Sequence, residues 1–481
     1  RADSEGGLGT ASKYWASAYI DAITTTGNIT VGGVITATTY NGIPFYSGDT
    51  GSIYTHDVSA TDSTATYNTA YGLTAMDAIT SGDWNTAVGY GAGGAINSGA
   101  SNTLVGYLTG DALTTGIRNV AIGANALSAE DAHGYNVAVG YSALAVQNAG
   151  ANAYNVAVGY EAGTSVTTGT ENTLIGGGAG DALTSGGRNT AIGYEALSAE
   201  DETGYAVAVG YQALRAQNSG GNSYNVAVGY NAGESVSTGT QNVIIGGLAG
   251  DALTEGEYNV LIGHAAGSAL TTGDRNVAIG RDALKTEDAN GWNVAVGYSA
   301  LSTLDAGAEA YNVAVGYNAG VVMTTGVQNV LIGGNAGDSL TTGGYNVAIG
   351  HEALATEDAH GKNVAIGWLA LSDQNAGADA FNIGIGYNAG KAMSTGVRNV
   401  MMGGLAGDAL TTGGHNVAIG YGALSAEDAH GRNVAIGSGA LYAQDAGADA
   451  YNVAIGFEAG LAVTTGIENT LLGGKAGDAL T

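Results

Sequence analysis

The chain contains no cysteine among its 481 residues, which excludes both a disulfide framework and a thiolate-bound metal. Basic residues are scarce, since 13 Lys and Arg stand against 42 Asp and Glu, and the formal net charge is −29. Nucleic-acid binding and adhesion to anionic membranes both require positive charge, so this balance argues against both partners. No apolar run approaches the ~20 residues of a membrane-spanning helix, so we expect no membrane insertion.

Proline occurs only once, at Pro44, whereas glycine is abundant at 84 residues. The glycines follow no Gly-X-Y period, which excludes a collagen-like triple helix. The apolar residues recur at fixed positions, which is typical of a folded repeat and not of disorder. No secretion signal is recognisable and the sequence stops inside a repeat, so we expect the chain to be part of a longer protein.

A five-residue motif, here called the Asn-Gly motif, recurs 23 times between Asn85 and Gly473. It consists of Asn, then Val, Thr or Ile, then a residue that is most often Ala, then Val, Ile, Leu or Met, and finally Gly. Gly closes every copy, and Asn opens every copy except one, in which Ala206 stands first. Self-similarity at a fixed period is the signature of a repeat architecture.

Successive copies are separated by a 17-residue step in most cases and by a 19-residue step in the others. The 19-residue steps begin at Asn136, Ala206, Asn293, Asn363 and Asn433. Three short steps and one long step make a 70-residue super-repeat, and one additional 17-residue unit occurs near Asn259. A solenoid grows by stacking such units, so the usual limit on domain size does not apply.

Within each motif, branched apolar residues alternate with a smaller one, as in Val120, Ala121 and Ile122. This period of two predicts a short β-strand, and the closing Gly allows a sharp bend after it. We therefore predict an all-β fold, a parallel β-solenoid with about two short strands per coil and equivalent residues stacked ~4.8 Å apart. The first and last residues of the motif should form structural ladders along the stack, represented by Asn119, Asn136, Asn155, Gly123, Gly140 and Gly159.

The Val and Ile side of each strand is expected to be the buried face of the coil. The middle residue then points the other way, and it is usually Ala, with larger residues such as Leu104, Leu174 and Met401 in some copies. A 17-residue coil looks too thin to cover both faces, so we expect this second face to pack against other chains in a parallel homotrimer. A single-chain left-handed β-helix of hexapeptide repeats is the competing fold, although its coils of about 18 residues do not match a 17-residue step.

The sequence Asn-Val-Ala-Ile-Gly, as in Asn119–Gly123, resembles the head repeat of the trimeric autotransporter adhesins, the YadA-like heads. The resemblance covers roughly residues 84–481 and implies a trimer of left-handed parallel β-rolls that adheres to surfaces without enzymatic activity. The coils are longer here than in that family, so the additional residues are expected in loops at one edge. The stretch from Leu8 to Trp15, with its continuation to Pro44, is similar to segments of bacteriophage tail fibres that precede a short β-structured shaft.

Glu-Asp pairs recur at one position of the super-repeat, at Glu130/Asp131, Glu200/Asp201, Glu287/Asp288, Glu357/Asp358 and Glu427/Asp428. Paired carboxylates can hydrolyse glycosidic bonds, but a column of copies is more typical of a solvated loop than of one catalytic cleft. Histidine follows three of the pairs, as His133, His360 and His430, whereas Thr203 and Asn290 take its place in the other two. We therefore expect neither a catalytic residue nor a required histidine ligand at these positions.

Calcium is the only metal that the sequence suggests, because hard cations prefer carboxylate oxygens. The stretch 246–254 approximates the calcium-binding nonapeptide Gly-Gly-x-Gly-x-Asp-x-apolar-x, with Ala in place of one Gly. Copies of this stretch recur at 70-residue or 87-residue intervals instead of directly following one another, so an Asp that caps a turn is the alternative interpretation. The candidate calcium ligands are Asp181, Asp251, Asp338, Asp408 and Asp478.

Aromatic residues form two further columns, one directly after the motif's Gly, as at Tyr141 and Tyr160, and one directly before its Asn, as at Tyr135 and Tyr154. Exposed rings can stack on sugars, but packing between neighbouring coils or chains is the expected role. The additional residues of the 19-residue coils should form loops that protrude once per super-repeat.

Three regions follow: a β-rich fibre shaft or attachment segment at 1–45, a transition or cap at 46–83, and a β-solenoid of 23 coils at 84–481. We expect a non-enzymatic structural fibre on a virion surface, as in a bacteriophage tail, that projects towards a host receptor or glycan through a tip outside this chain. The head of a trimeric adhesin on a bacterial cell surface is the main alternative, and a polysaccharide-degrading fibre is the second.

Overall fold

A computed structural model of the chain describes residues 39–40, 43–44, 53–55, 64–202 and 204–481. The chain divides into two compact units, residues 1–45 and residues 46–481. In the first unit, β1 (Thr39–Tyr40) and β2 (Ile43–Pro44) pair antiparallel. The rest of the shaft predicted for 1–45, and part of the transition predicted for 46–83, lies outside the described residues.

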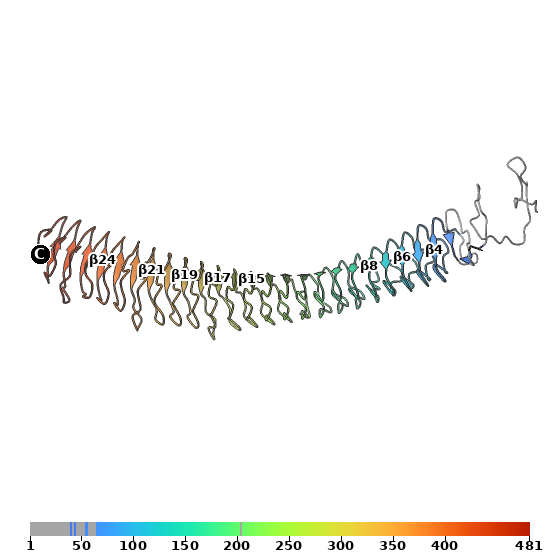
Figure 1. Cartoon of the computed structure of the whole chain (residues 1–481), viewed down its shortest axis with the longest axis horizontal. Coiled ribbons are helices and arrows are strands. Elements are labelled where there is room, and N and C mark those ends of the chain that lie inside the picture. The colour runs from blue at the N-terminus through green and yellow to red at the C-terminus, as the bar shows by residue number, and fades with distance from the viewer. Residues whose placement is uncertain (1–38, 41–42, 45–52, 56–63, 203) are drawn as a thin grey trace, which may run out of the picture. The chain divides into compact units, whose positions relative to one another are not determined.

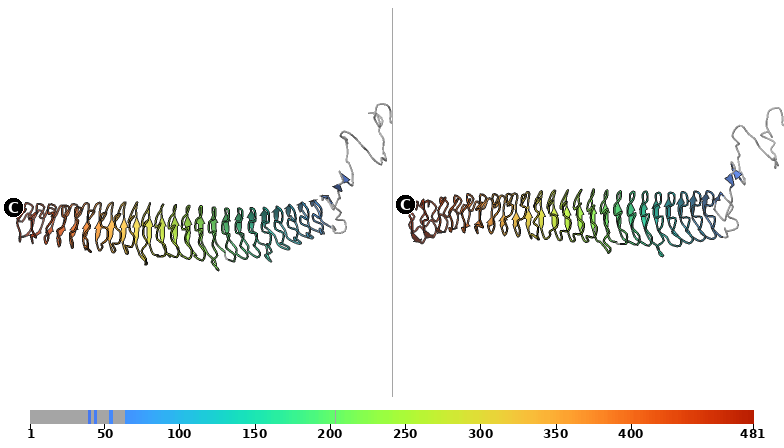
Figure 2. Two further views of the ribbon diagram at one scale, coloured as in Figure 1. Left: turned by 60° about the horizontal axis from the view of Figure 1, so that its bottom comes forward. Right: turned by 90° about the horizontal axis from the view of Figure 1, so that it is seen from below.

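The second unit is a parallel β-solenoid, which confirms the prediction of an all-β fold built from stacked coils. Its 25 strands, β3 to β27, pair in sequence order, so that the coils stack one after another (Figure 1). Views from two further sides show the same order of coils from the N-terminal to the C-terminal end of the stack (Figure 2).

The strands of the solenoid are β3 (Ile53–Tyr54), β4 (Thr69–Tyr71), β5 (Thr86–Val88), β6 (Thr103–Val105), β7 (Val120–Ile122), β8 (Val137–Val139), β9 (Val156–Val158), β10 (Thr173–Ile175), β11 (Thr190–Ile192), β12 (Val207–Val209), β13 (Val226–Val228), β14 (Val243–Ile245), β15 (Val260–Ile262), β16 (Val277–Ile279), β17 (Val294–Val296), β18 (Val313–Val315), β19 (Val330–Ile332), β20 (Val347–Ile349), β21 (Val364–Ile366), β22 (Ile383–Ile385), β23 (Val400–Met402), β24 (Val417–Ile419), β25 (Val434–Ile436), β26 (Val453–Ile455) and β27 (Thr470–Leu472).

The strand register is the same in 17-residue and 19-residue steps. Ala121 of β7 lies opposite Ala138 of β8 across a 17-residue step, and Ala138 lies opposite Ala157 of β9 across a 19-residue step. A one-residue slip would reverse the face of every side chain, so the register is strongly specified by the motif. The two additional residues of a 19-residue coil are therefore absorbed in its loop and not in the sheet.

The solenoid begins before the predicted boundary at residue 84. β3 pairs with β4 and β4 pairs with β5, all in parallel. Residues 68–72 form a further copy of the Asn-Gly motif, and the side-chain oxygen of Asn68 accepts a hydrogen bond from the backbone N–H of Asn85 at 2.8 Å. The sequence pattern missed this copy because Tyr71 occupies the position that Val, Ile, Leu or Met holds elsewhere.

The prediction of which strand face lies inside the coil was wrong. The middle residue of the motif is the buried one, as at Ala121, whereas Val120 is half-buried and Ile122 is 39% exposed. The same pattern repeats from β5 to β26, so the Val and Ile side forms a continuous outer face. Because the coil is narrow, the middle position of the strand has room for a small residue such as Ala. Leu144 and other residues of the turns fill the rest of the core.

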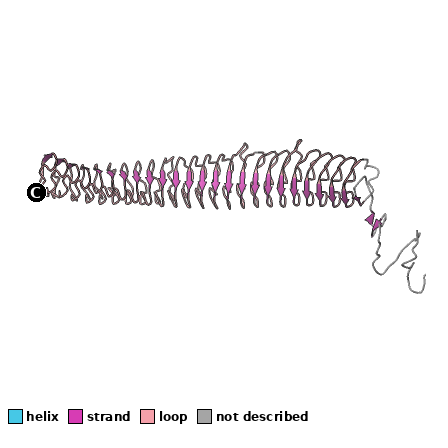
Figure 3. Cartoon of the chain, turned by 90° about the horizontal axis from the view of Figure 1, so that it is seen from above, coloured by secondary structure: helices cyan, strands magenta, loops and turns pink. Residues whose placement is uncertain are grey.

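The prediction of two short strands per coil was also wrong, since each described coil of the solenoid contains one strand (Figure 3). The residues after the strand form tight turns, and Asn125 and Leu127 adopt positive φ angles of 57° and 53°. L-residues with positive φ cannot continue a β-strand. Their backbone groups still bond to the adjacent coil, since the Leu127 N–H donates to the Ala143 carbonyl at 3.0 Å.

Candidate functional site

The Asn residues of the motif form a buried hydrogen-bonded column. The side-chain oxygen of Asn119 accepts from the Asn136 backbone N–H at 3.0 Å, and that of Asn136 accepts from the Asn155 N–H at 3.1 Å. Asn155 also donates through Nδ2 to the Gly169 carbonyl and to Oε1 of Gln147, each at 2.7 Å. These side chains are fully buried and hydrogen-bonded to the next coil, so their role in this chain is structural.

The Gly residues of the motif form a second column in which backbones approach closely. Gly123, Gly140 and Gly159 have φ angles of 130°, 145° and 149°. A Cβ added to Gly140 would lie 2.0 Å from the Gly159 carbonyl oxygen, and one added to Gly123 would lie 2.3 Å from that of Gly140. Only glycine fits both the φ angle and this spacing.

The prediction that the Glu-Asp pairs lie in a solvated loop was wrong for the glutamates. Each Glu occupies a core position of the coil that precedes a 19-residue coil, and its side chain is fully buried, at Glu130, Glu200, Glu287, Glu357 and Glu427. The same position is buried in the neighbouring coils, where it is occupied in turn by Leu113, Glu130, Gln147 and Val166. The position of the glutamate in the coil therefore belongs to the core. The adjacent Asp residues lie nearer the surface, as exposed Asp428 does.

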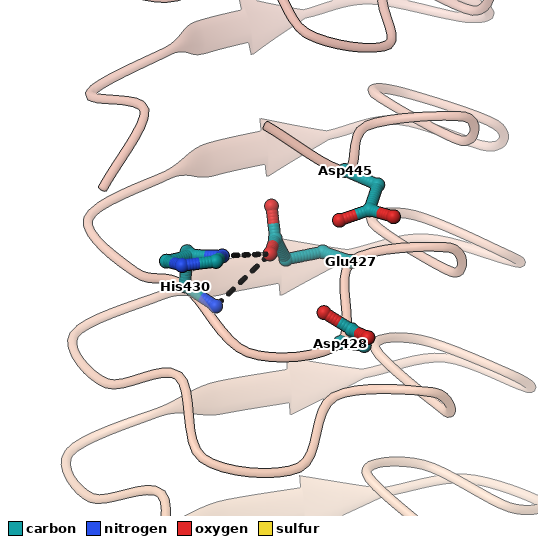
Figure 4. A group of neighbouring side chains, drawn as sticks. All are labelled: Glu427, Asp428, His430 and Asp445. Atoms are coloured by element: carbon teal, nitrogen blue, oxygen red, sulfur yellow. Dashed lines mark hydrogen bonds and ion pairs between the residues drawn. The ribbon is translucent and has the colours of Figure 1, made fainter. Parts of the chain in front are cut away.

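Glu427 belongs to the largest group of neighbouring acidic and histidine side chains in the described part of the chain (Figure 4). One ligand atom each from Glu427, Asp428, His430 and Asp445 lies within 4.8 Å of the others. The His430 backbone N–H donates to Glu427 Oε1 at 3.0 Å, and His430 Nδ1 lies 3.5 Å from the same oxygen. Asp445 comes from the following coil, so the group joins two coils.

Burial sets the electrostatics of Glu427. Loss of water around the carboxylate raises its pKa above the usual value of 4.5, and the hydrogen bond from the His430 N–H partly opposes that rise. Glu130 and Glu357 show the same direction of pKa shift for the same reason. A buried carboxylate is stabilised when it binds a proton or a cation, because either one offsets the cost of burying its charge.

Three further groups have related compositions: Glu130, Asp131 and His133; Glu357, Asp358 and His360; and Glu287, Asp288 and Asp305. The sequence analysis did not find Asp305 or Asp445 as neighbours of the pairs, although each follows the Asp of its pair by one 17-residue step. That spacing, one coil, was the signal that could have identified them.

The five candidate calcium ligands are not brought together. Each lies in a different coil, and in the described chain none belongs to a group of three or more acidic or histidine ligands. Asp181 instead lines a surface cavity of about 230 Å³, together with Tyr160, Glu161, Tyr194 and Glu195. Burial raises the pKa of Asp181, Asp251 and Asp338. Asp408 accepts a hydrogen bond from the Ser425 hydroxyl. The Asp478 N–H donates a hydrogen bond to the Lys475 carbonyl.

Both aromatic columns stack between neighbouring coils. Tyr141 and Tyr160, which follow the motif's Gly, have ring centroids 5.6 Å apart. Tyr135 and Tyr154, which precede the Asn, have centroids 5.0 Å apart, and Arg118 lies over the Tyr135 ring. The rings are nevertheless substantially exposed, 61% for Tyr160, so they stabilise the coil surface and still face solvent.

No protein-family model matches the chain, and no curated protein matches it significantly. Among the described residues, no helix has the length and apolar composition needed to cross a membrane.

Proposed function

We propose that this chain is the shaft of a homotrimeric surface fibre, as in a bacteriophage tail fibre, that carries a receptor-binding tip away from its attachment point. The supporting observation is the parallel β-solenoid of 25 strands, which contains no break in pairing from β3 to β27. At ~4.8 Å per strand, such a stack spans roughly 115 Å. The interior is occupied by packed side chains and hydrogen-bonded asparagines, which favours a mechanical role over catalysis.

The outer Val and Ile face is the surface through which we propose that three copies associate. Most coils present two apolar, partly exposed residues on this face, and the coils in which Thr is the first strand residue present one. Ile175, Ile245 and Ile332 are each 37% exposed. Standard interfaces bury ~800 Å² per partner, and this face continues along the stack from β5 to β26. A second and third copy in parallel register fit it best, because their own faces have the same length and the same spacing of rungs.

The direct test is the mass of the purified chain by light scattering and sedimentation. We expect a trimer for the wild type and a monomer for the triple variant Ile175→Lys, Ile245→Lys and Ile332→Lys. The control variant Ala151→Lys, Ala308→Lys and Ala378→Lys adds the same charge at exposed loop positions and should remain trimeric. A monomeric wild type with an intact solenoid would refute the association.

The fibre role is tested separately by electron microscopy and binding assays. A rod of roughly 115 Å, the length expected from the strand spacing, attached to a virion and labelled by antibodies against this chain, supports the phage fibre. Display of the same rod on a bacterial cell envelope would instead identify the head of a cell-surface adhesin. Sustained release of reducing ends from host polysaccharide by the purified chain would contradict a non-enzymatic shaft.

A further inference from the structure

We propose that the three histidine-containing clusters, at Glu130, Glu357 and Glu427, are binding sites for a divalent transition-metal cation such as Zn²⁺. Each combines imidazole nitrogen with carboxylate oxygen, a donor set that suits zinc better than calcium, which prefers oxygen alone. These sites are distinct from the calcium candidates at Asp181 and its repeats. The Glu427 cluster has the most complete set, with three carboxylates and one imidazole.

Unpaired buried atoms point to a ligand in these clusters. The Glu427 side chain is fully buried, yet its Oε2 has no hydrogen-bond partner in the described structure, and neither does His430 Nδ1. Glu130 Oε2 and His133 Nδ1 likewise lack a hydrogen bond, as do Glu357 Oε2 and His360 Nδ1, and the two ring nitrogens lie 3.5 Å and 3.8 Å from Oε1 of their glutamates. A buried carboxylate oxygen without a partner is costly unless it binds a cation or a proton.

The Glu287 coil provides an internal comparison. Asn290 stands where the other clusters have histidine, and both its N–H and its Nδ2 donate to Glu287 Oε1 at 3.1 Å. Glu287 Oε2 accepts a longer bond of 3.4 Å from the Ala306 N–H. In this coil, which has no imidazole, hydrogen bonds thus reach both carboxylate oxygens. Each histidine cluster instead leaves Oε2 of its Glu without a hydrogen bond, and its ring nitrogen has only an ion-pair contact with Oε1 of the same Glu.

Charge and access also favour a cation. In the described structure, no Lys or Arg forms an ion pair with Glu427, Asp428 or Asp445, so the cluster's negative charge has only His430 beside it. Asp428 and Asp445 are exposed and the His430 side chain is 30% exposed, so a hydrated ion can reach the buried Glu427 from solvent. Metal binding would neutralise the buried carboxylate and cross-link two successive coils through Asp445.

The test is Zn²⁺ binding to the full chain after treatment with a chelator, measured by calorimetry and by metal analysis after gel filtration. We expect about three Zn²⁺ per chain, one for each cluster. His430→Asn copies the arrangement of Asn290 and should lower the stoichiometry by one, and the triple variant with His133→Asn and His360→Asn should retain none. His415→Asn, at a histidine outside the clusters, is the matched control and should bind as the wild type does.

Cobalt substitution provides a second readout that does not depend on stability. Co²⁺ bound through nitrogen and oxygen ligands should give visible absorption bands that decrease by one third in His430→Asn. Far-UV circular dichroism identifies any variant that fails to fold, and Glu427→Gln then serves as the replacement. No binding at micromolar Zn²⁺, equal binding by the triple variant, or displacement of Zn²⁺ by millimolar Ca²⁺ would each overturn the proposal.

Discussion

The Asn column makes a quantitative prediction, because its members do not carry equal numbers of hydrogen bonds. Asn155→Ala leaves three buried groups without partners: the Asn172 N–H, the Gly169 carbonyl and Gln147 Oε1. Each unpaired buried group costs ~1–3 kcal/mol, so the substitution should destabilise its coil by at least ~3 kcal/mol. Asn136→Ala leaves only the Asn155 N–H unpaired and also removes Nδ2, which has no partner in the described structure.

The reason for this difference is the coil length. In a 17-residue coil, Nδ2 donates to the carbonyl 14 residues ahead, as Asn155 does to Gly169. Asn136 opens a 19-residue coil, and the residue at the same offset ahead is Gly150, which lies in the exposed loop. The cost of Asn136→Ala should therefore be close to zero, since the lost bond is offset by the removal of a buried unpaired donor.

Hydrogen exchange measured by mass spectrometry is the appropriate assay. A solenoid opens locally, so a global melting temperature does not report the stability of one coil. Because ~1.4 kcal/mol corresponds to a factor of ten, Asn155→Ala should accelerate exchange around Asn172 about a hundredfold or more. Asn136→Ala should change exchange around Asn155 by less than about tenfold. Equal effects of the two substitutions would refute the bond count on which the argument depends.

The remaining predictions concern the Gly column and a buried carboxylate. Gly140→Ala should destabilise its coil by about 3 kcal/mol, because the new Cβ would lie 2.0 Å from a backbone oxygen. Gly221→Ala should not destabilise its coil, because no atom lies within 4 Å of the new Cβ. Hydrogen exchange of the two coils measures the difference between the substitutions. Burial raises the pKa of Glu287 above 4.5, so the wild type should lose stability as pH rises through that raised pKa, and Glu287→Gln should abolish this loss. Hydrogen exchange of the coil around Glu287, corrected for the pH dependence of the intrinsic exchange rate, measures the difference between about pH 4 and 8, with exposed Glu255→Gln as control. Faster exchange in Glu287→Gln than in the wild type at pH 7 would contradict the prediction.

The repeat predicts the fold because register and stacking are properties of spacing, and spacing is visible in the sequence. Ala121, Ala138 and Ala157 align in the sheet as the 17- and 19-residue steps require. The sequence also predicted structural ladders of Asn and Gly, since identical residues at each step occupy the same position in successive coils. The close approach of the glycine backbones was found only in the structure. These features depend on the distance between copies and not on which side of the strand is interior.

The sequence could not identify the interior face, because both faces of the strand are apolar. Val120 and Ile122 have a higher β-propensity than Ala121, yet the narrow coil places the small residue inside. The burial of Glu130 was missed for a related reason, since charged residues are rarely buried and the pair was treated as part of a loop. Comparison of the position one coil earlier, Leu113, and one coil later, Gln147, would have placed it in the core.

Glu130 and Gln147 are the two polar residues in the buried column that runs from Leu113 to Val166, and their burial has different explanations. Gln147 serves the ladder: its Oε1 accepts from Asn155 Nδ2, the first Asn after a 19-residue coil, and its Nε2 donates to the Thr167 carbonyl. Glu130, one coil earlier, accepts a hydrogen bond from the His133 N–H three residues away. In the described structure it forms no hydrogen bond with an Asn of the Asn-Gly motif. Leu113 fills the same position in the preceding coil, so packing does not require an acid there. A buried Glu nevertheless stands at this position before every 19-residue coil, and beside His133 a bound cation would give its carboxylate the partner that it lacks in the described structure.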